Sequence, residues 1–472
     1  MLKRIVRNFS WMMFSEILSQ LMAFLLVVVA ARYLGDIGLG QFSFALAFAE
    51  TVFIFADFGL NAWFIREASR EPSKSYVYLS NINGIRTVAG IVCFIAVLIM
   101  GVISGMSNDK LIVTMLLSGG LFLALLTSGM RCIFAAYEQM SFMAFEKIIK
   151  TGGNLLIGFA VLHYGYGVIA FTFATLLSYV LAFLFVLAVS KGKFVGFGFR
   201  FDMNVWQEII KASVPFWLQG MIMQLQQRSG ILILSFLKGD AVTGWFSVAD
   251  QLVRSLYFIP MNLVTAVFPA MSKLFGRADD SLKKVFTKTW DYLFIIILPI
   301  AVGSTLLGPR IIEFFYKSRF VESGIILQVL IWSQVFLFLN YLLGYYLISI
   351  HRQKVIVLSS GIATIANIVL NFTLVPFYSY IGTAIAAIIA GAIDFGVMML
   401  NISGDYRRVV LISTIKPVIC GIIMGVFVFL LRDLHIIYLV PAAAVVYFIF
   451  LVLLGVIGKE ESNLIRMIWK KS

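Results

Sequence analysis

Long hydrophobic segments separated by short polar stretches follow one another along almost the whole chain. Roughly fourteen of them reach the ~20 residues that a transmembrane helix requires. They do not alternate in polarity every second residue, as the strands of a membrane barrel do, so the pattern predicts helices. The predicted spans are 9–34, 38–64, 80–105, 111–135, 143–163, 166–189, 209–237, 241–270, 289–308, 324–350, 354–377, 380–401, 409–431 and 434–457.

Composition supports a polytopic membrane protein. Of the 472 residues, 61% are hydrophobic and 13% are charged, and the mean hydropathy is +0.98. A soluble domain is about half apolar and about a quarter charged, and no soluble core could bury this excess. The longest polar loops lie near residues 65–79, 190–208 and 271–288, and each is too short to fold as a soluble domain. This disfavours functions that need an extramembrane catalytic or receptor domain.

Basic residues are distributed unevenly between alternate loops. If the odd-numbered spans leave the cytoplasm, most of the 37 Lys and Arg residues lie on the cytoplasmic side, as the positive-inside rule predicts. We therefore expect a multi-pass protein of the cytoplasmic (inner or plasma) membrane with both termini in the cytoplasm. The same rule explains the net charge of +14 without a nucleic-acid partner.

One phrase occurs twice in the chain. The stretch "LGDIGLGQFSFALA" at 34–47 returns as "KGDAVTGWFSVADQ" at 238–251. The copies lie between spans 1 and 2 and between spans 7 and 8, so an even number of crossings separates them and the repeat is parallel. We expect an all-α integral membrane fold of two six-helix lobes with two extra C-terminal helices. The expected divisions are an N-lobe at 1–190, a cytoplasmic linker at 191–208, a C-lobe at 209–402, and the last two spans with a cytoplasmic tail at 403–472.

Three longer stretches resemble a known family. "ARYLGDIGLGQFSFALAFAETVFIFADFGLNAWFIREASRE", "GWFSVADQLVRSLYFIPMNLVTAVFPAMSKL" and "NIVLNFTLVPFYSYIGTAIAAIIA" are similar to the polysaccharide biosynthesis proteins, the Wzx-type lipid-linked oligosaccharide flippases. These belong to the multidrug/oligosaccharidyl-lipid/polysaccharide exporter superfamily. The resemblance implies that the chain moves a polyprenyl-linked sugar across the membrane by alternating access between two lobes.

Charged residues inside spans are candidate functional residues, because each costs at least ~2.5–3.5 kcal/mol near the bilayer centre. Arg offers a planar fork for phosphate, so Arg228 and Arg254 are predicted to contact the substrate headgroup, with Arg32 as a weaker third. The amides Gln224 and Asn371 are candidates for sugar contacts. The predicted ion-coupling or charge-pair residues are Glu16, Glu50, Asp57, Asp250 and Asp394.

The repeat suggests one specific ion pair. Glu50 and Arg254 occupy equivalent positions in the two copies, and we hypothesise that they pair across the lobes in one conformation. Asp250 lies one helical turn before Arg254, so a pair within the helix is an alternative. Arg86 and Asp291 lie near the starts of spans, where they are expected to reach the lipid headgroups.

No enzyme motif occurs in the chain. A Walker loop, GxSxG and HExxH are all missing, and the Cys and His residues are scattered, so we expect neither an enzyme, a cofactor nor a metal site. Transport would be driven by an ion gradient or by the substrate gradient. We expect a monomer whose partners are its lipid-linked substrate, membrane lipids and the glycosyltransferases or glycan polymerase of the same assembly route.

Three other functions fit parts of the pattern. The first is an ion-coupled multidrug exporter of the same superfamily, which the two intramembrane Arg residues disfavour. The second is a membrane glycan polymerase or ligase, which would require a large outer loop. The third is a non-transporting scaffold of an envelope assembly complex, in which the intramembrane charges would have no purpose.

Overall fold

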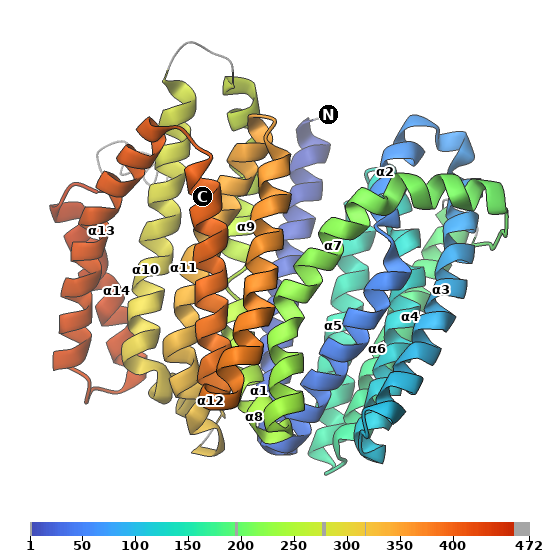
Figure 1. Ribbon diagram of the computed structural model, residues 1–472, viewed down its shortest axis with the longest axis horizontal. Helices are drawn as coiled ribbons and strands as arrows, with labels where there is room; N and C mark the ends of the chain where they lie inside the picture. The colour runs from blue at the N-terminus through green and yellow to red at the C-terminus, as the bar shows by residue number, and fades with distance from the viewer. Residues whose placement is uncertain (1, 194–196, 276–279, 317, 457–472) are drawn as a thin grey trace. The chain divides into compact units, whose positions relative to one another are not determined.

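The computed structural model describes residues 2–193, 197–275, 280–316 and 318–456, and no strand occurs among them (Figure 1). Helices follow each other with short connections throughout these ranges. Their bounds are α1 (Leu2–Asp57), α2 (Leu60–Arg70), α3 (Ser75–Ile103), α4 (Asn108–Ala136), α5 (Met140–His163), α6 (Val168–Lys193), α7 (Met203–Lys238), α8 (Asp240–Arg254), α9 (Phe258–Leu274), α10 (Ser281–Tyr316), α11 (Val321–Ser349), α12 (Gln353–Leu400), α13 (Gly404–Leu430) and α14 (Ile436–Leu453).

These helices account for the predicted spans. Within the described ranges, ten helical stretches are long and apolar enough to cross a membrane. The helices α1 and α12 have 56 and 48 residues, enough for two crossings each, and each contains one non-helical residue, Gly35 or Ser379. The helices α5 and α7 are also long enough, but they carry charged and amide side chains between their ends. The prediction of an all-α integral membrane fold is confirmed.

Two predicted spans are interrupted in the structure. Span 2 was expected to reach residue 64, but α1 ends at Asp57 because Phe58 and Gly59 adopt left-handed φ angles of 48° and 63°. Span 8 was predicted as one segment, 241–270, and a turn at residues 255–257 divides it into α8 and α9. Pro260 lies in the first turn of α9, where its missing N–H leaves no helical hydrogen bond unmade.

The helices form two compact units, which we call unit 1 and unit 2. Unit 1 comprises Met1–Gln251 and Ile368–Thr383, and unit 2 comprises Leu252–Asn367 and Ala384–Ser472. In unit 1, a core around Leu60, Phe64 and Phe134 joins α2 to α4. In unit 2, a core around Phe286 and Leu342 joins α10 to α11. The lobe boundary predicted from the repeat stays a prediction, and the predicted tail beyond residue 456 lies outside the described residues.

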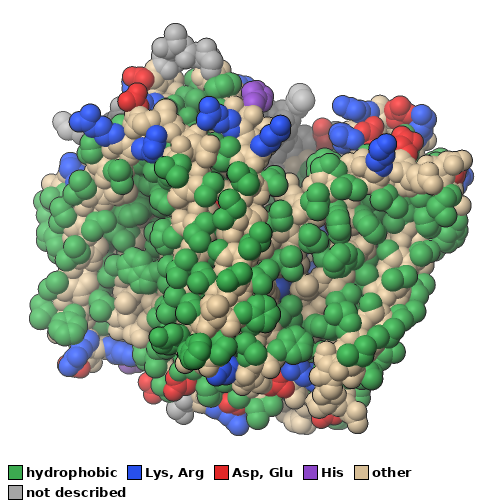
Figure 2. Space-filling model, viewed as in Figure 1, with side chains coloured by type: hydrophobic (Ala, Val, Ile, Leu, Met, Phe, Trp, Pro, Cys, Tyr) green, Lys and Arg blue, Asp and Glu red, His purple; other side chains and the backbone are tan. Residues whose placement is uncertain are grey.

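Each unit carries a hydrophobic surface between two charged ends. On the visible face, the sides of the helices present mainly hydrophobic side chains, whereas Lys, Arg, Asp and Glu gather near the helix ends (Figure 2). Many of the exposed large side chains are aliphatic or aromatic, such as Leu156, Phe173, Ile365 and Ile422. This is the surface expected for helices whose sides face lipid.

The repeated phrase makes the same bend twice within unit 1. Gly35 has φ 71° and ψ −171°, and Gly239 has φ 85° and ψ −176°, a conformation that is essentially restricted to glycine. The two bends also contact each other reciprocally. A methyl group on Gly40 would lie 1.8 Å from the carbonyl oxygen of Asp240, and one on Gly244 would lie 2.0 Å from that of Asp36. The parallel repeat therefore brings its two copies into direct backbone contact.

Candidate functional site

Glu50, Arg228 and Gln224 form one polar cluster within unit 1. Glu50 lies on the second half of α1, and Arg228 and Gln224 lie one turn apart on α7. Arg228 Nε is 2.6 Å from Glu50 Oε2, and Gln224 Nε2 donates to the same oxygen at 3.5 Å. The Arg228 and Glu50 side chains are 19% and 25% exposed, so water or a ligand can reach this pair. Three predicted site residues thus meet although they are distant in the sequence.

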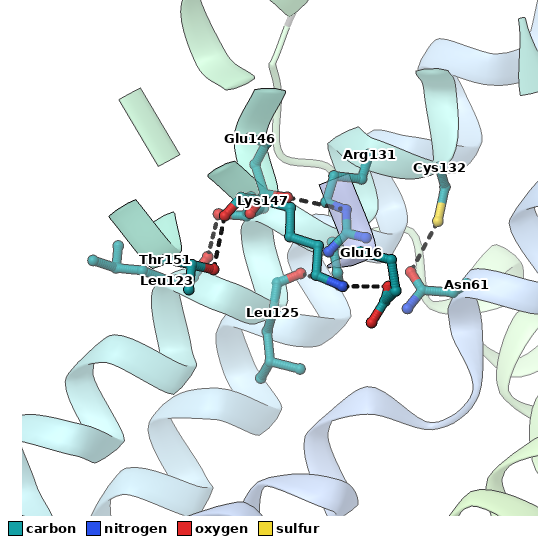
Figure 3. A network of polar contacts seen from close by, with 11 residues as sticks. Glu16, Asn61, Leu123, Leu125, Arg131, Cys132, Glu146, Lys147 and Thr151 are labelled. Carbon is teal, nitrogen blue, oxygen red and sulfur yellow. Dashed lines mark hydrogen bonds and ion pairs between the residues drawn. The ribbon is translucent and has the colours of Figure 1, made fainter. Parts of the chain in front are cut away.

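A second cluster joins α1, α4 and α5 (Figure 3). Lys147 Nζ donates to Glu16 Oε2 at 2.5 Å, and Gln20 Nε2 donates to the other carboxylate oxygen at 3.2 Å. Beside them, Arg131 Nε lies 3.4 Å from Glu146 Oε2, and that Glu146 side chain is 3% exposed. One turn further along α5, Lys150 lies over the ring of Tyr179 at 5.3 Å.

The basic members of this second cluster lie within helices. Arg131 is on α4 and Lys147 and Lys150 are on α5, and all three pair or pack inside unit 1. The spacing of the stretch "EKIIK" at 146–150 places Glu146 and Lys150 on one helical face, and this spacing could have indicated an inward-facing polar strip.

Arg86 is the most deeply buried charge in unit 1. It was expected to reach the headgroups, but its side chain has no exposed surface. One of its terminal nitrogens donates to Asp57 Oδ1 at 2.8 Å and to Asn61 Oδ1 at 3.0 Å. Asn61 also accepts from the Cys132 thiol at 3.0 Å (Figure 3). Asp57 is thus held at the point where α1 ends, because its partner on α3 is buried beside it.

The remaining predicted basic and amide residues lie on α1, α8 and α12. Arg32 lies on the exposed side of α1 just before the bend at Gly35. Asn371 is fully buried on the first half of α12, where it lies near Gly230 of α7. Asp250 and Arg254 share α8. The hypothesised pair of Glu50 and Arg254 would join residues of different units and stays a prediction.

Asp394 stands apart from the other predicted acids. It lies on the second half of α12 in unit 2 and is only 7% exposed. Asn340 Nδ2 of α11 donates to Asp394 Oδ2 at 3.4 Å and to the carbonyl of Gly391 at 3.2 Å. The other carboxylate oxygen, Oδ1, has no hydrogen-bond partner.

The chemistry of unit 1 is that of exchangeable ion pairs. Each of four intramembrane cations lies beside a carboxylate, which neutralises it within the low-dielectric interior. An anionic ligand could take the place of Glu50 at the accessible Arg228 and keep that cation paired. No group of three or more His, Cys, Asp or Glu side chains is placed to hold a metal ion in the described ranges.

Sequence comparison places the chain in a family. The profile described as "Polysaccharide biosynthesis protein" matches residues 5–275, which is more than half of the chain. The chain belongs to the polysaccharide biosynthesis protein family. A second profile, described as MatE, matches residues 215–373. The resemblance noted in the sequence is thereby confirmed.

Curated relatives of this family member are distant, and two of the three described here span most of its length. The capsular polysaccharide biosynthesis protein CapF of Staphylococcus aureus is 22% identical over 390 residues, which cover 82% of this chain and 96% of that protein. The membrane protein MJ1068 of Methanocaldococcus jannaschii is 21% identical over 503 residues, covering 98% and 97%. The lipid II flippase MurJ of Bacillus subtilis is 25% identical over 187 residues, covering 37% and 34%.

Solved structures of two membrane transporters are similar in fold to this chain. A structure of the lipid II flippase MurJ in an inward closed conformation has a TM-score of 0.79 at 18% identity and covers 95% of this chain and 99% of that one. An inward-facing multidrug resistance transporter of the MATE family has a TM-score of 0.64 at 15% identity, covering 83% and 95%. The chain shares the all-α fold of these two transporters.

Proposed function

We propose that this protein is a flippase that moves a polyprenyl-(di)phosphate-linked oligosaccharide from the cytoplasmic to the outer leaflet. It would do so by alternating access, for assembly of a cell-surface polysaccharide or glycoconjugate, and without a catalytic step of its own. It would act as a monomer in the cytoplasmic membrane, with both termini in the cytoplasm. It would receive its substrate from glycosyltransferases and pass it to a glycan polymerase.

The observation that carries this proposal is the accessible pair of Arg228 and Glu50. A phosphate or diphosphate crossing hydrocarbon needs a cation that is inside the membrane and also within reach. Arg86 is fully buried, whereas the Arg228 side chain is 19% exposed and its guanidinium can bind phosphate with two parallel hydrogen bonds. Glu50 would hold Arg228 neutralised until substrate replaces it.

Gln224 extends the same site toward a sugar. Its amide already reaches Glu50 from the helix that carries Arg228. When phosphate displaces Glu50, this amide is released to hydrogen-bond a hydroxyl or an N-acetyl group. We therefore propose Arg228 as the headgroup contact and Gln224 as its neighbour toward the glycan, with Arg254 as a second headgroup contact.

Reconstitution tests the proposal. The purified protein would be placed in proteoliposomes with a short-chain polyprenyl-diphosphate sugar, and exposure of the sugar in the opposite leaflet would be followed by lectin binding. We expect protein-dependent exposure that falls at least about tenfold in Arg228→Gln, since a charge-assisted hydrogen bond contributes about 1.5–3 kcal/mol. Arg254→Gln would be measured in parallel.

A matched control is available outside the membrane segments. Arg66 on α2 pairs with Glu67 at 2.8 Å, and its side chain is 47% exposed. Arg66→Gln removes the same charge and should leave the rate unchanged. A rate that is unchanged in both Arg228→Gln and Arg254→Gln would remove these contacts from the proposal, and no sugar exposure with wild-type protein would contradict the flippase itself.

A multidrug exporter is the second candidate. The MatE profile match to residues 215–373 favours it. Such a transporter would carry cationic amphiphiles, for which the carboxylate of Glu50 rather than Arg228 would be the contact. Efflux of a fluorescent organic cation from the same proteoliposomes, lost in Glu50→Gln but kept in Arg228→Gln, would support this alternative.

A further inference from the structure

Unit 2 contains a cavity that is lined by none of the site residues described above. Its volume is about 490 Å³, which is in the ~300–1,000 Å³ range of small-molecule sites. The lining residues come from the ends of α9, α11 and α12 and from the beginnings of α10, α12 and α13, so the cavity lies at one end of unit 2. A ligand in this cavity would contact all five helices at once.

Arg352 is the charged side chain among the described residues that line this cavity. It directly precedes α12, and its Nη1 atom donates to the carbonyl of Asn401, at the other end of α12, at 2.9 Å. This hydrogen bond fixes the guanidinium beside the connection between α12 and α13. In the described ranges no ion pair includes Arg352, and its other N–H groups have no acceptor in the protein. The cavity therefore holds an anchored cation without a carboxylate partner.

The beginning of α13 adds further hydrogen-bond donors. Ser403 is the N-cap of this 27-residue helix, and its hydroxyl makes no capping hydrogen bond. The N–H groups of the first turn are left for another acceptor, and the helix dipole favours a negative charge at this end. The nearest acids along the chain, Asp280 and Asp405, are exposed and are not among the lining residues. Together with Arg352, this arrangement favours an anion, and a phosphate matches the planar guanidinium with two parallel hydrogen bonds.

The rest of the cavity is mainly apolar and reaches the side of the helices. The rings of Tyr346 and Tyr406 pack together with centroids 5.2 Å apart, and both residues line the cavity. Leu400 lines it as well, yet this residue is 72% exposed. The helix α13 presents further exposed apolar side chains, among them Leu411 and Ile412. A headgroup inside the cavity can thus continue, past Leu400, into a hydrocarbon chain on the lipid-facing surface of unit 2.

The charge of this end of unit 2 favours the same kind of ligand. Basic residues precede or follow the lining residues within a few positions, namely Lys273, Lys283, Lys284, Lys354 and Arg408. The positive-inside rule assigns this end to the cytoplasm. The cytoplasmic leaflet carries anionic phospholipids, and basic pockets between helices on that side bind their headgroups.

We propose that this cavity binds the phosphate headgroup of an anionic phospholipid of the surrounding membrane. Arg352 is the phosphate contact, and the first turn of α13 supplies the second set of donors. The acyl chains leave the cavity past Leu400. The bound lipid links the connection between α11 and α12 to the connection between α12 and α13, and so stabilises unit 2. This ligand is a resident membrane lipid, so the site does not depend on which molecule the protein transports.

Native mass spectrometry of the delipidated protein tests the proposal. Phosphatidylglycerol would be titrated in detergent, with phosphatidylcholine of the same acyl chains as the comparison without net charge. We expect one phosphatidylglycerol to stay bound at concentrations where phosphatidylcholine does not. Arg352→Gln should weaken this binding at least about tenfold, because it removes charge-assisted hydrogen bonds. Arg408→Gln removes the same charge from an exposed residue that does not line the cavity, and it should bind as wild type does.

Leu400 supplies a second pair of variants, which leave the hydrogen bond between Arg352 and Asn401 in place. Because Leu400 is exposed, Leu400→Glu and Leu400→Gln should both fold. Leu400→Glu adds a negative charge to the cavity wall and should weaken phosphatidylglycerol binding at least about tenfold, whereas the uncharged Leu400→Gln should keep it. Phosphatidylglycerol should raise the unfolding temperature of wild type and of Leu400→Gln, but not that of Leu400→Glu.

Three results would overturn the proposal. Equal phosphatidylglycerol binding in wild type, Arg352→Gln and Leu400→Glu would place the lipid elsewhere. Stabilisation by inorganic phosphate or ATP that equals that by phosphatidylglycerol would make the ligand a soluble phosphate compound. Displacement of phosphatidylglycerol by an equal concentration of the polyprenyl-diphosphate sugar would assign the cavity to the transported substrate. The leaflet assay measures sugar movement separately, so a failure of lipid binding leaves the proposed function standing.

Discussion

Arg86 illustrates how burial changes the contribution of an ion pair to stability. An exposed pair contributes about 0–1 kcal/mol, whereas removing one partner of a buried pair costs about 3–5 kcal/mol because a charge is left without compensation. Arg86 has no exposed surface, and Asp57 is the carboxylate paired with it among the described residues. Two of its nitrogens, Nε and one terminal nitrogen, have no hydrogen-bond partner, so Arg86 depends strongly on the contacts of its other terminal nitrogen with Asp57 and Asn61.

The Asp57–Arg86 pair therefore gives a stability prediction. Asp57→Asn should lower stability by about 3 kcal/mol, at the lower end of the range for buried pairs because the Asp57 side chain is 30% exposed. The double variant with Arg86→Met should recover part of this loss, since it removes the stranded charge. Thermal unfolding in detergent, followed by fluorescence size-exclusion, measures both. Glu67→Gln, which breaks the exposed pair with Arg66, is the control. An equal loss of stability in Asp57→Asn and Glu67→Gln would contradict the argument.

Arg228 allows charge and geometry to be separated. Arg228→Lys keeps a cation near Glu50 but loses the planar fork, so thermal stability should stay close to wild type while sugar exposure falls about tenfold. The comparison is the leaflet assay beside the unfolding temperature of the same preparation. A wild-type rate in Arg228→Lys would mean that only the charge of Arg228 matters.

Most members of these clusters could be recognised from the sequence, but their partners could not. Intramembrane charges are costly, so Glu16, Glu50, Asp57, Arg228 and Asp394 were recognisable as functional candidates. Pairing depends on which helices touch. Glu50 and Arg228 lie far apart in the chain, and the internal repeat pointed from Glu50 to Arg254 rather than to Arg228.

Among the helices, the contact between the two copies of the repeat depends on missing side chains. Gly40 lies against the backbone carbonyl of Asp240, and Gly244 lies against that of Asp36, which is the equivalent residue of the other copy. Lys110 of α4 fastens the same region, because its Nζ donates to Asp240 at 2.5 Å and lies 3.9 Å from the ring centroid of Phe44. The repeated phrase was visible in the sequence. The contact between its two copies was not visible, because a repeat shows which residues are equivalent but not how far apart they lie in space.

Gly40→Ala and Gly244→Ala should each push the two bends apart. The added methyl would lie 2.0 Å or less from a backbone oxygen, which cannot move as a flexible side chain can. We expect each variant to lose about 1–3 kcal/mol of stability, the usual range for overpacking. Distances between spin labels at the ends of α4 and α8 would lengthen if the bends separate.

Gly303→Ala is the matched control for these variants. Gly303 lies within α10, and an added methyl there would meet nothing within 4 Å. Its stability should equal or slightly exceed that of wild type, because alanine favours the helix by up to about 1 kcal/mol. Wild-type stability and distances in both Gly40→Ala and Gly244→Ala would show that the close approach is dispensable.

At the scale of the whole molecule, hydropathy predicted where the membrane-spanning segments lie, but it did not predict which helices pack together. Segment length reflects the thickness of hydrocarbon, which is a property of each segment alone, and most predicted boundaries differ from the observed ones by only a few residues. Packing requires knowledge of partners. Unit 1 includes α7 and the stretch Ile368–Thr383, although both lie beyond the first six spans, because Arg228 of α7 pairs with Glu50 of α1 and Gly230 of α7 lies against Thr383.

The predicted orientation of the whole chain can be tested by labelling single cysteines in intact cells. The positive-inside rule places the connection before α3 in the cytoplasm and the connection after it outside. Ser73 and Asn108 lie at these two connections, and both are exposed. We expect a membrane-impermeant maleimide to label Asn108→Cys but not Ser73→Cys, and both to react after the cells are opened. The native Cys93, Cys132 and Cys420 are buried, so the wild-type protein serves as the unlabelled control. The reverse labelling pattern would invert the chain in the membrane, and with it the direction of transport proposed above.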